Sequence, residues 1–169
     1  MATQLNPSAQ HLYEQDYYAW TQAQAAELRA MAKRPIDTSL DLEHLAEEAA
    51  DLGHSERDAV RSQARRVIEH LLKLEYSPAA EPRDGSKDTV ADARSVIDDK
   101  LSPSLRLDLE TMLPRLYGQV LPKARRALRR FGETAPAGTL PSACPYALDD
   151  ICRPEWYPAN RRGIVDEPD

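Results

Sequence analysis

The sequence predicts an all-α fold, a single-domain helical bundle of about five main helices plus a short C-terminal helix. The chain has 169 residues, enough for one domain with its own core. Its abundant residues, Ala, Leu, Arg and Glu, are good helix formers, whereas Val and Ile are too few for a large sheet. Apolar residues make up 41% and charged residues 30%, a balance typical of a soluble globular protein.

Composition also excludes several classes of protein. No apolar run approaches the roughly 20 residues of a membrane helix, and the first twenty residues lack the basic and apolar regions of a signal peptide. The two cysteines, Cys144 and Cys152, form neither a disulfide framework nor a CxxC zinc motif. The net charge of −6 argues against broad nucleic-acid binding. We therefore expect a cytoplasmic protein without a cofactor.

Breakers and caps divide the N-terminal half into helices. Residues 1–7 are expected to form a flexible tail, followed by a helix from about Ser8 and His11 to Ala32 that ends before Arg34-Pro35. A second helix is predicted from about Ser39 to Leu52, with an apolar face that consists of Leu42, Leu45, Ala46, Ala49 and Leu52.

Gly53 is expected to end that helix and Ser55 to cap a third, which runs to about Tyr76. The joint at Gly53-His54-Ser55 would then make the two helices an αα-hairpin. In such a hairpin Glu48 would pair with Arg57 or Arg61.

The C-terminal half follows the same logic. Residues 77–86 read as a loop rich in Pro and Gly. Three further helices are predicted, from about 87 to 101, from about 103 to 131, and from Cys144-Pro145 to about Cys152. Pro114 and Pro122 should kink the middle one or divide it in two. The helical domain would span residues 8–152, and 153–169 would be an irregular tail.

Several segments resemble a bacterial family catalogued as domain-of-unknown-function family 29, and they occur in the family's order. They are "LYEQDYYAW" (12–20), "LDLEHLAEEAADLGHSERDAV" (40–60), "HLLKLEY" (70–76), "SPSLR" (102–106) and "PSACPYALDDI" (141–151). The resemblance implies an all-helical domain and brings no activity with it. The family often has a bulky aliphatic residue where this chain has Ala49, and an aromatic one where it has Glu75.

The segment from Leu42 to Val60 holds enough carboxylates and imidazoles to raise the question of a metal site. Glu43 and Glu47 are four residues apart and share a helix face, as do His44 and Glu48. Di-iron bundles need two Glu-x-x-His motifs, but the chain has only one related form, Asp41-x-x-His44. We therefore expect solvated carboxylates and no metal. The alternative is a small helical metal-binding protein or enzyme that uses Glu43, Glu47 and His70.

Other residues could contact a ligand or partner. Trp20 is either core or the lining of a pocket, and Glu48 and His70 are either satisfied residues at the core boundary or part of a small-ligand site. Cys144 at a helix N-cap could have a lowered pKa, but no histidine lies nearby in the sequence to act as a base.

Charge is segregated along the chain. Residues 37–51 hold six acidic residues and no Lys or Arg, whereas 115–130 hold six basic residues and no acid. Arg125, Arg126, Arg129 and Arg130 should form a surface that faces a protein partner or solvent, with Ala124, Leu128 and Phe131 turned inward. A non-catalytic interaction or accessory module is thus the leading expectation, acting on a protein partner or as a homo-oligomer, with nucleic acid an improbable partner.

Overall fold

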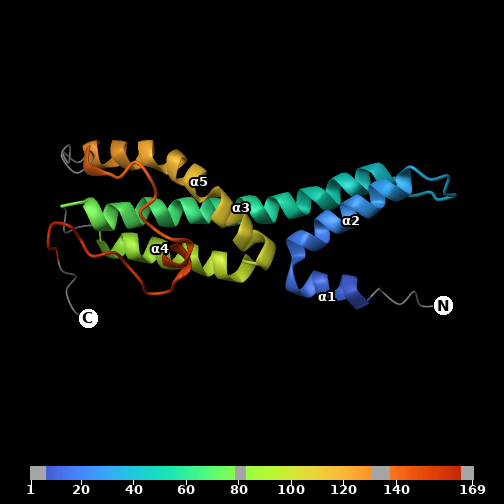
Figure 1. Ribbon diagram of the computed structural model, residues 1–169, viewed down its shortest axis with the longest axis horizontal. Coiled ribbons are helices and arrows are strands. Elements are labelled where there is room, and N and C mark those ends of the chain that lie inside the picture. The colour runs from blue at the N-terminus through green and yellow to red at the C-terminus, as the bar shows by residue number, and fades with distance from the viewer. Residues whose placement is uncertain (1–6, 79–82, 131–137, 165–169) are drawn as a thin grey trace. The chain divides into compact units, whose positions relative to one another are not determined.

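The structure is a computed structural model that describes residues 7–78, 83–130 and 138–164 (Figure 1). These ranges contain helices and no strand, so the predicted all-α fold is confirmed. The helices are α1 (Pro7–Gln15), α2 (Tyr17–Ala32), α3 (Leu42–Tyr76), α4 (Arg83–Lys100), α5 (Pro103–Arg130) and α7 (Leu148–Cys152). No helix within the described ranges is both long enough and apolar enough to cross a bilayer.

The chain divides into two compact units. Unit 1 comprises Met1–Ala59 and Leu101–Asp108, and unit 2 comprises Val60–Lys100 and Leu109–Asp169. Helices α3 and α5 each contribute residues to both. The single domain over 8–152 stays a prediction. Pro7 already belongs to α1, and the rest of the predicted N-terminal tail lies outside the described residues.

Unit 1 contains a helical hairpin, but the hairpin is not the predicted one. Helix α3 continues without a break through Gly53-His54-Ser55, and its N-terminal part instead lies antiparallel to α2 across the loop 33–41 (Figure 1). Gly53 is buried because α2 approaches it closely: an added Cβ would overlap Thr21 Oγ1 and lie 2.7 Å from Gln22 Nε2. This glycine therefore serves a helix crossing and does not end a helix.

The same crossing decides which face of α3 is buried in unit 1. Leu42, Ala46 and Ala50 are buried at four-residue spacing. By contrast, the predicted core residues Leu45 and Leu52 are 42% and 54% exposed. The predicted apolar face was therefore wrong in part, because the small side chains of Ala46, Ala50 and Gly53 let α2 approach along their own row.

A second correction concerns the N-terminal helix, which is two helices joined at Asp16. The Asp16 carboxylate accepts a 3.0 Å hydrogen bond from the Ala19 backbone N–H and so caps α2. It also accepts 2.8 Å hydrogen bonds from Ser102 Oγ and from the Ser104 N–H. Burial alone would raise the pKa of Asp16, but these hydrogen bonds outweigh it and lower the pKa.

Unit 2 holds most of the largest fully buried side chains of α3, α4, α5 and α7. They include Ile68, Leu71, Leu72, Ile97, Leu116, Tyr117 and Ile151. Helix α4 begins at Arg83, within the predicted loop, and Arg83 Nη1 donates a 2.8 Å hydrogen bond to the Leu74 carbonyl.

Helix α5 is one continuous helix, so the predicted alternative of two segments was wrong. Pro114 and Pro122 lack the N–H groups that would pair with the carbonyls of Glu110 and Gly118. All four residues are exposed, so water can hydrogen-bond to those carbonyls in place of the helix.

The segment 153–164 contains turns and no helix, yet unit 2 holds it firmly. The buried Arg94 guanidinium donates hydrogen bonds of 2.8 to 2.9 Å to the carbonyls of Asp150, Ile151 and Trp156. Asn160 Nδ2 donates to the carbonyls of Leu74 and Ser77 at 2.9 and 2.8 Å.

Candidate functional site

Exposed apolar side chains mark unit 1 as the candidate site. Among the described residues, every large hydrophobic side chain that is exposed belongs to this unit. These residues are Tyr13, Ile36, Leu40, Leu45, Leu52 and Leu107. Single exposed apolar residues are ordinary, but their confinement to one unit is not expected from chance scatter. Unit 1 is therefore where contact with another molecule would bury apolar surface.

Three of α3's residues form a stripe on that surface. Leu45, Ala49 and Leu52 are spaced i, i+4 and i+7, so they lie along one side of the helix, and we call them the leucine stripe. Ala49 is half-buried, and both leucines are exposed. The stripe lies beside the buried row Leu42-Ala46-Ala50, which faces α2.

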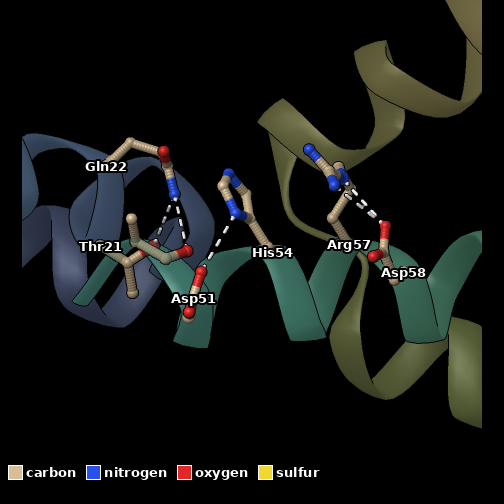
Figure 2. Close-up of polar contacts among 7 residues, drawn as sticks. Thr21, Gln22, Asp51, His54, Arg57 and Asp58 are labelled. Carbon is tan, nitrogen blue, oxygen red and sulfur yellow. Dashed lines mark hydrogen bonds and ion pairs between the residues drawn. The ribbon is translucent and has the colours of Figure 1, made fainter. Parts of the chain in front are cut away.

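Acidic side chains surround this part of α3, but only Glu48, three residues after Leu45 and four before Leu52, lies beside the stripe. Glu43 and Glu47 are each two residues from Leu45 and lie on the opposite face of the helix. Glu43, Glu47 and Glu48 are all exposed, and no ion pair involves them within the described residues. The predicted pairing of Glu48 with Arg57 was wrong, because it depended on the hairpin joint at Gly53. Arg57 instead contacts its neighbour Asp58 at 3.1 Å (Figure 2).

The two histidines of this segment pair with aspartates three residues earlier, and of these aspartates Asp41 immediately precedes α3 whereas Asp51 lies on it. His44 Nδ1 lies 2.6 Å from Asp41 Oδ2, and this hydrogen bond raises the pKa of His44 and lowers that of Asp41. His54 Nδ1 lies 3.6 Å from Asp51 Oδ1 (Figure 2). Each pair is local in the sequence, and among the described residues neither belongs to a group of three or more side chains that could hold a metal ion.

The residues of the metal-binding alternative are dispersed along α3. Glu43 and Glu47 occupy its first two turns in unit 1, whereas His70 follows about six turns later in unit 2. Within the described ranges, no group of three or more His, Cys, Asp or Glu side chains has an arrangement suited to a metal ion.

Trp20 lines a cavity of ≈ 500 Å³ in unit 1. The cavity is bounded by residues of α1, α2 and the start of α5: His11, Leu12, Gln15, Asp16, Trp20, Ala23, Gln24 and Pro103. Trp20 also stacks on Tyr17 with ring centroids 5.7 Å apart and meets Tyr13 edge to face at 4.8 Å. The indole thus packs in an aromatic cluster and presents one side to a pocket, and its use for a ligand stays a prediction.

His70 is half-buried in unit 2, and its Nδ1 is buried with no hydrogen-bond partner among the described residues. Burial lowers the pKa of His70 to about 4, and nearby Lys73 adds to the effect. The imidazole is therefore neutral at pH 7. Its neighbour Glu69 forms ion pairs with Lys73 and Lys123 at 2.8 and 2.7 Å. These contacts hold the pKa of Glu69 low, although burial alone would raise it.

The basic run lies on α5 in unit 2. Arg126 and Arg129 are exposed and Arg125 is half-buried, whereas the side chain of Arg130 and the predicted core residue Phe131 lie outside the described residues. Ala124 and Leu128 are buried, as their spacing predicted. What the arginines face stays a prediction.

Cys144 does not cap a helix, because α7 begins at Leu148 with Ala147 as its N-cap. Burial raises the pKa of the Cys144 thiol, which donates a weak hydrogen bond to the Tyr146 carbonyl at 3.5 Å. The thiol is thus protonated at neutral pH, and the helix-terminus argument for reactivity was wrong.

Sequence reasoning missed a buried polar cluster in unit 2. Glu75 Oε2 accepts a 2.8 Å hydrogen bond from the Tyr146 hydroxyl, and Glu75 Oε1 accepts one of 2.7 Å from Arg161 Nε. A glutamate among apolar helix residues was the available signal. Its partners lie 71 and 86 residues away, so spacing could not identify them.

Comparisons agree with this fold. A crystal structure of an alpha-helical protein of unknown function from Rhodospirillum rubrum ATCC 11170 is similar, with a TM-score of 0.74 and 27% sequence identity over 85% of this chain and 90% of that one. None of the curated proteins matches the chain. The fold defines an all-helical domain. The family model for the domain of unknown function DUF29 matches residues 12–157, and the chain belongs to that family.

Proposed function

We propose that this protein is a non-catalytic interaction module that binds a protein partner through unit 1. The observation that carries the proposal is the confinement of exposed large apolar side chains to that unit. Burial of a leucine stabilises a complex by roughly 1.5–3 kcal/mol, so a few such residues can decide whether two proteins associate. A cytoplasmic location is part of the proposal, supported by two free cysteines.

No observation favours the alternative of a metal-binding protein or enzyme strongly enough to propose it. Glu43 and Glu47 are exposed on the first turns of α3, and His70 belongs to a different unit. Elemental analysis of protein purified without chelator provides the direct comparison. About one tightly bound ion per chain that disappears in the E43Q/E47Q variant would replace the interaction proposal with the metal-binding one.

The interaction proposal is tested by site-specific photo-crosslinking in the organism that makes the protein. A benzophenone amino acid would replace Leu45 or Leu52 in unit 1, and exposed Ser95 on α4 in unit 2 as the matched control. We expect a discrete protein adduct at Leu45 and Leu52 but not at Ser95. The adduct at Leu52 should be lost when Leu45→Ser is added. Equal labelling at all three positions would contradict the proposal.

A further inference from the structure

We infer that the leucine stripe of α3 binds a basic amphipathic helix of a protein partner. This inference rests on the proposed function and adds the chemistry of the partner. Leu45 and Leu52 are seven residues apart, so the two exposed side chains are separated by about 10.5 Å along the helix axis. That spacing matches the apolar anchors i and i+7 of a partner helix that packs alongside.

The charge around the stripe determines the sign of the charge that the partner should carry. Glu48 is exposed beside the leucines, Glu43 and Glu47 are exposed on the opposite face of α3, and residues 37–51 contain no Lys or Arg. Because these three glutamates form no ion pair within the described residues, their charge is available to an incoming molecule. A partner helix with Lys or Arg beside its apolar anchors would meet Glu48 on the side of the seam away from the buried row, and the other carboxylates would attract it at longer range.

The same charge disfavours the other occupants of an apolar stripe. A second copy that docked α3 against α3 would bring two acidic faces together, and like charges at close range oppose that contact. Nucleic acids and anionic lipid surfaces would be repelled for the same reason. The apolar contact supplies the affinity, while the exposed glutamates guide the approach and favour a positively charged partner.

The test measures binding of a fluorescent Leu/Lys amphipathic peptide of about five helical turns, roughly 18 residues. A Leu/Glu peptide of the same apolar pattern serves as the charge control. The L45S/L52S variant removes the stripe. The L113S variant is the matched control, because Leu113 is a partly exposed leucine of α5 in unit 2. Far-ultraviolet circular dichroism verifies that each variant keeps its helix content.

We expect the Leu/Lys peptide to bind at least about tenfold more weakly to L45S/L52S and within about twofold of normal to L113S. The E43Q/E47Q/E48Q variant should bind more weakly and with a smaller dependence on salt. Equal binding of the Leu/Glu peptide, or equal loss in L113S, would overturn the inference.

Two results separate this inference from the function on which it depends. If photo-crosslinking at Leu45 and Leu52 succeeds but the Leu/Lys peptide does not bind, the interaction function stands and the partner chemistry is wrong. If the native protein forms dimers and the L45S/L52S variant does not, the partner chemistry is again wrong. The stripe would then bind a second copy of the chain. If neither crosslinking nor peptide binding occurs, the interaction function itself fails.

Discussion

Gly53 on α3 lies so close to Thr21 on α2 that a single added carbon would overlap the threonine hydroxyl oxygen. The Thr21 hydroxyl donates a hydrogen bond to the Tyr18 carbonyl at 2.8 Å. The Gln22 side-chain nitrogen, drawn beside Thr21 in Figure 2, donates to the Ala50 carbonyl at 3.4 Å. Neither side chain can move away without loss of its hydrogen bond. The crossing of α2 and α3 in unit 1 therefore requires glycine at position 53.

The first prediction is that Gly53→Ala destabilises the protein. Overpacking costs typically 1–3 kcal/mol, which exceeds the roughly 1 kcal/mol that alanine gains over glycine inside a helix. Urea unfolding should show the loss. Gly118→Ala on α5 is the matched control, because nothing lies within 4 Å of an added Cβ there. That variant should be as stable as the native chain or more so.

A double-mutant cycle identifies the cause. Thr21→Ala removes the overlapping oxygen, so Thr21→Ala with Gly53→Ala should recover much of the lost stability. If the two substitutions are simply additive, the close approach is not the reason for the glycine.

The second prediction concerns Asp16. Asp16→Ala removes the cap of α2 and the acceptor of two hydrogen bonds from the start of α5, and the free energy of unfolding should fall by about 2–3 kcal/mol. Asp16→Asn should cost less, because it can keep the cap. It replaces the oxygen that accepts the Ser104 N–H with a donor.

The pH dependence of Asp16 has a definite sign. Its pKa in the folded protein lies below the ordinary value of 3.8, so its contribution is present above that value and is lost as the pH falls through the folded pKa. Unfolding measured between pH 6 and pH 2 should show less acid sensitivity in Asp16→Asn than in the native chain. Identical pH profiles would contradict this account.

The third prediction concerns His70, whose pKa falls from 6.5 to about 4 on folding. The unfolded chain therefore binds more protons between these values, and stability should decrease as the pH drops through this window. His70→Leu should reduce that decrease and leave stability at pH 7 equal or higher, since it removes a buried nitrogen without a described partner. Melting temperatures at several pH values provide the measurement.

His44 supplies the control of opposite sign. Its pKa is raised by Asp41, so its small contribution is present at acid pH and is lost as the pH rises. His44→Gln should therefore not reduce the acid sensitivity. A protein whose stability between pH 6.5 and pH 4 is unchanged by His70→Leu would disprove the role of His70.

The fourth prediction concerns Tyr146, whose hydroxyl is bonded to the buried Glu75 carboxylate. Burial and the carboxylate both raise the pKa of Tyr146, so the phenol stays protonated and donates at all ordinary pH values. Tyr146→Phe should lower the free energy of unfolding by about 1.5–3 kcal/mol, the value of a hydrogen bond to a charged group. Tyr157→Phe, which loses only a 3.4 Å bond to the Lys87 carbonyl, should cost under about 0.5 kcal/mol.

Local signals predicted much of the helical framework. Pro35 separates the first two helical regions, and Ser102-Pro103 begins α5, because proline and capping residues act through neighbouring backbone. Gly53 misled the prediction, since a glycine that ends a helix and one that admits a neighbouring helix look alike in the sequence. Asp16 was missed because its partners Ser102 and Ser104 are more than 80 residues away.

The candidate site was likewise only partly predictable from local sequence. The acidic character of residues 37–51 was evident from composition, but the exposure of Leu45 and Leu52 was not. Periodicity places both leucines near an apolar face, and only the position of α2 determines which side of that face is covered. Tertiary packing therefore decided the feature on which the proposed function depends.

Arg94 makes the segment after α7 more resistant to local unfolding than its lack of helix suggests. One guanidinium bonds three carbonyls, and Arg161 adds its own N–H to the Glu75 carbonyl at 2.9 Å. In native-state hydrogen exchange, the Arg161 amide should then open together with the adjoining end of α3 rather than fray independently. A protease that cuts after exposed arginines would accordingly find Arg161 resistant until this part of unit 2 unfolds.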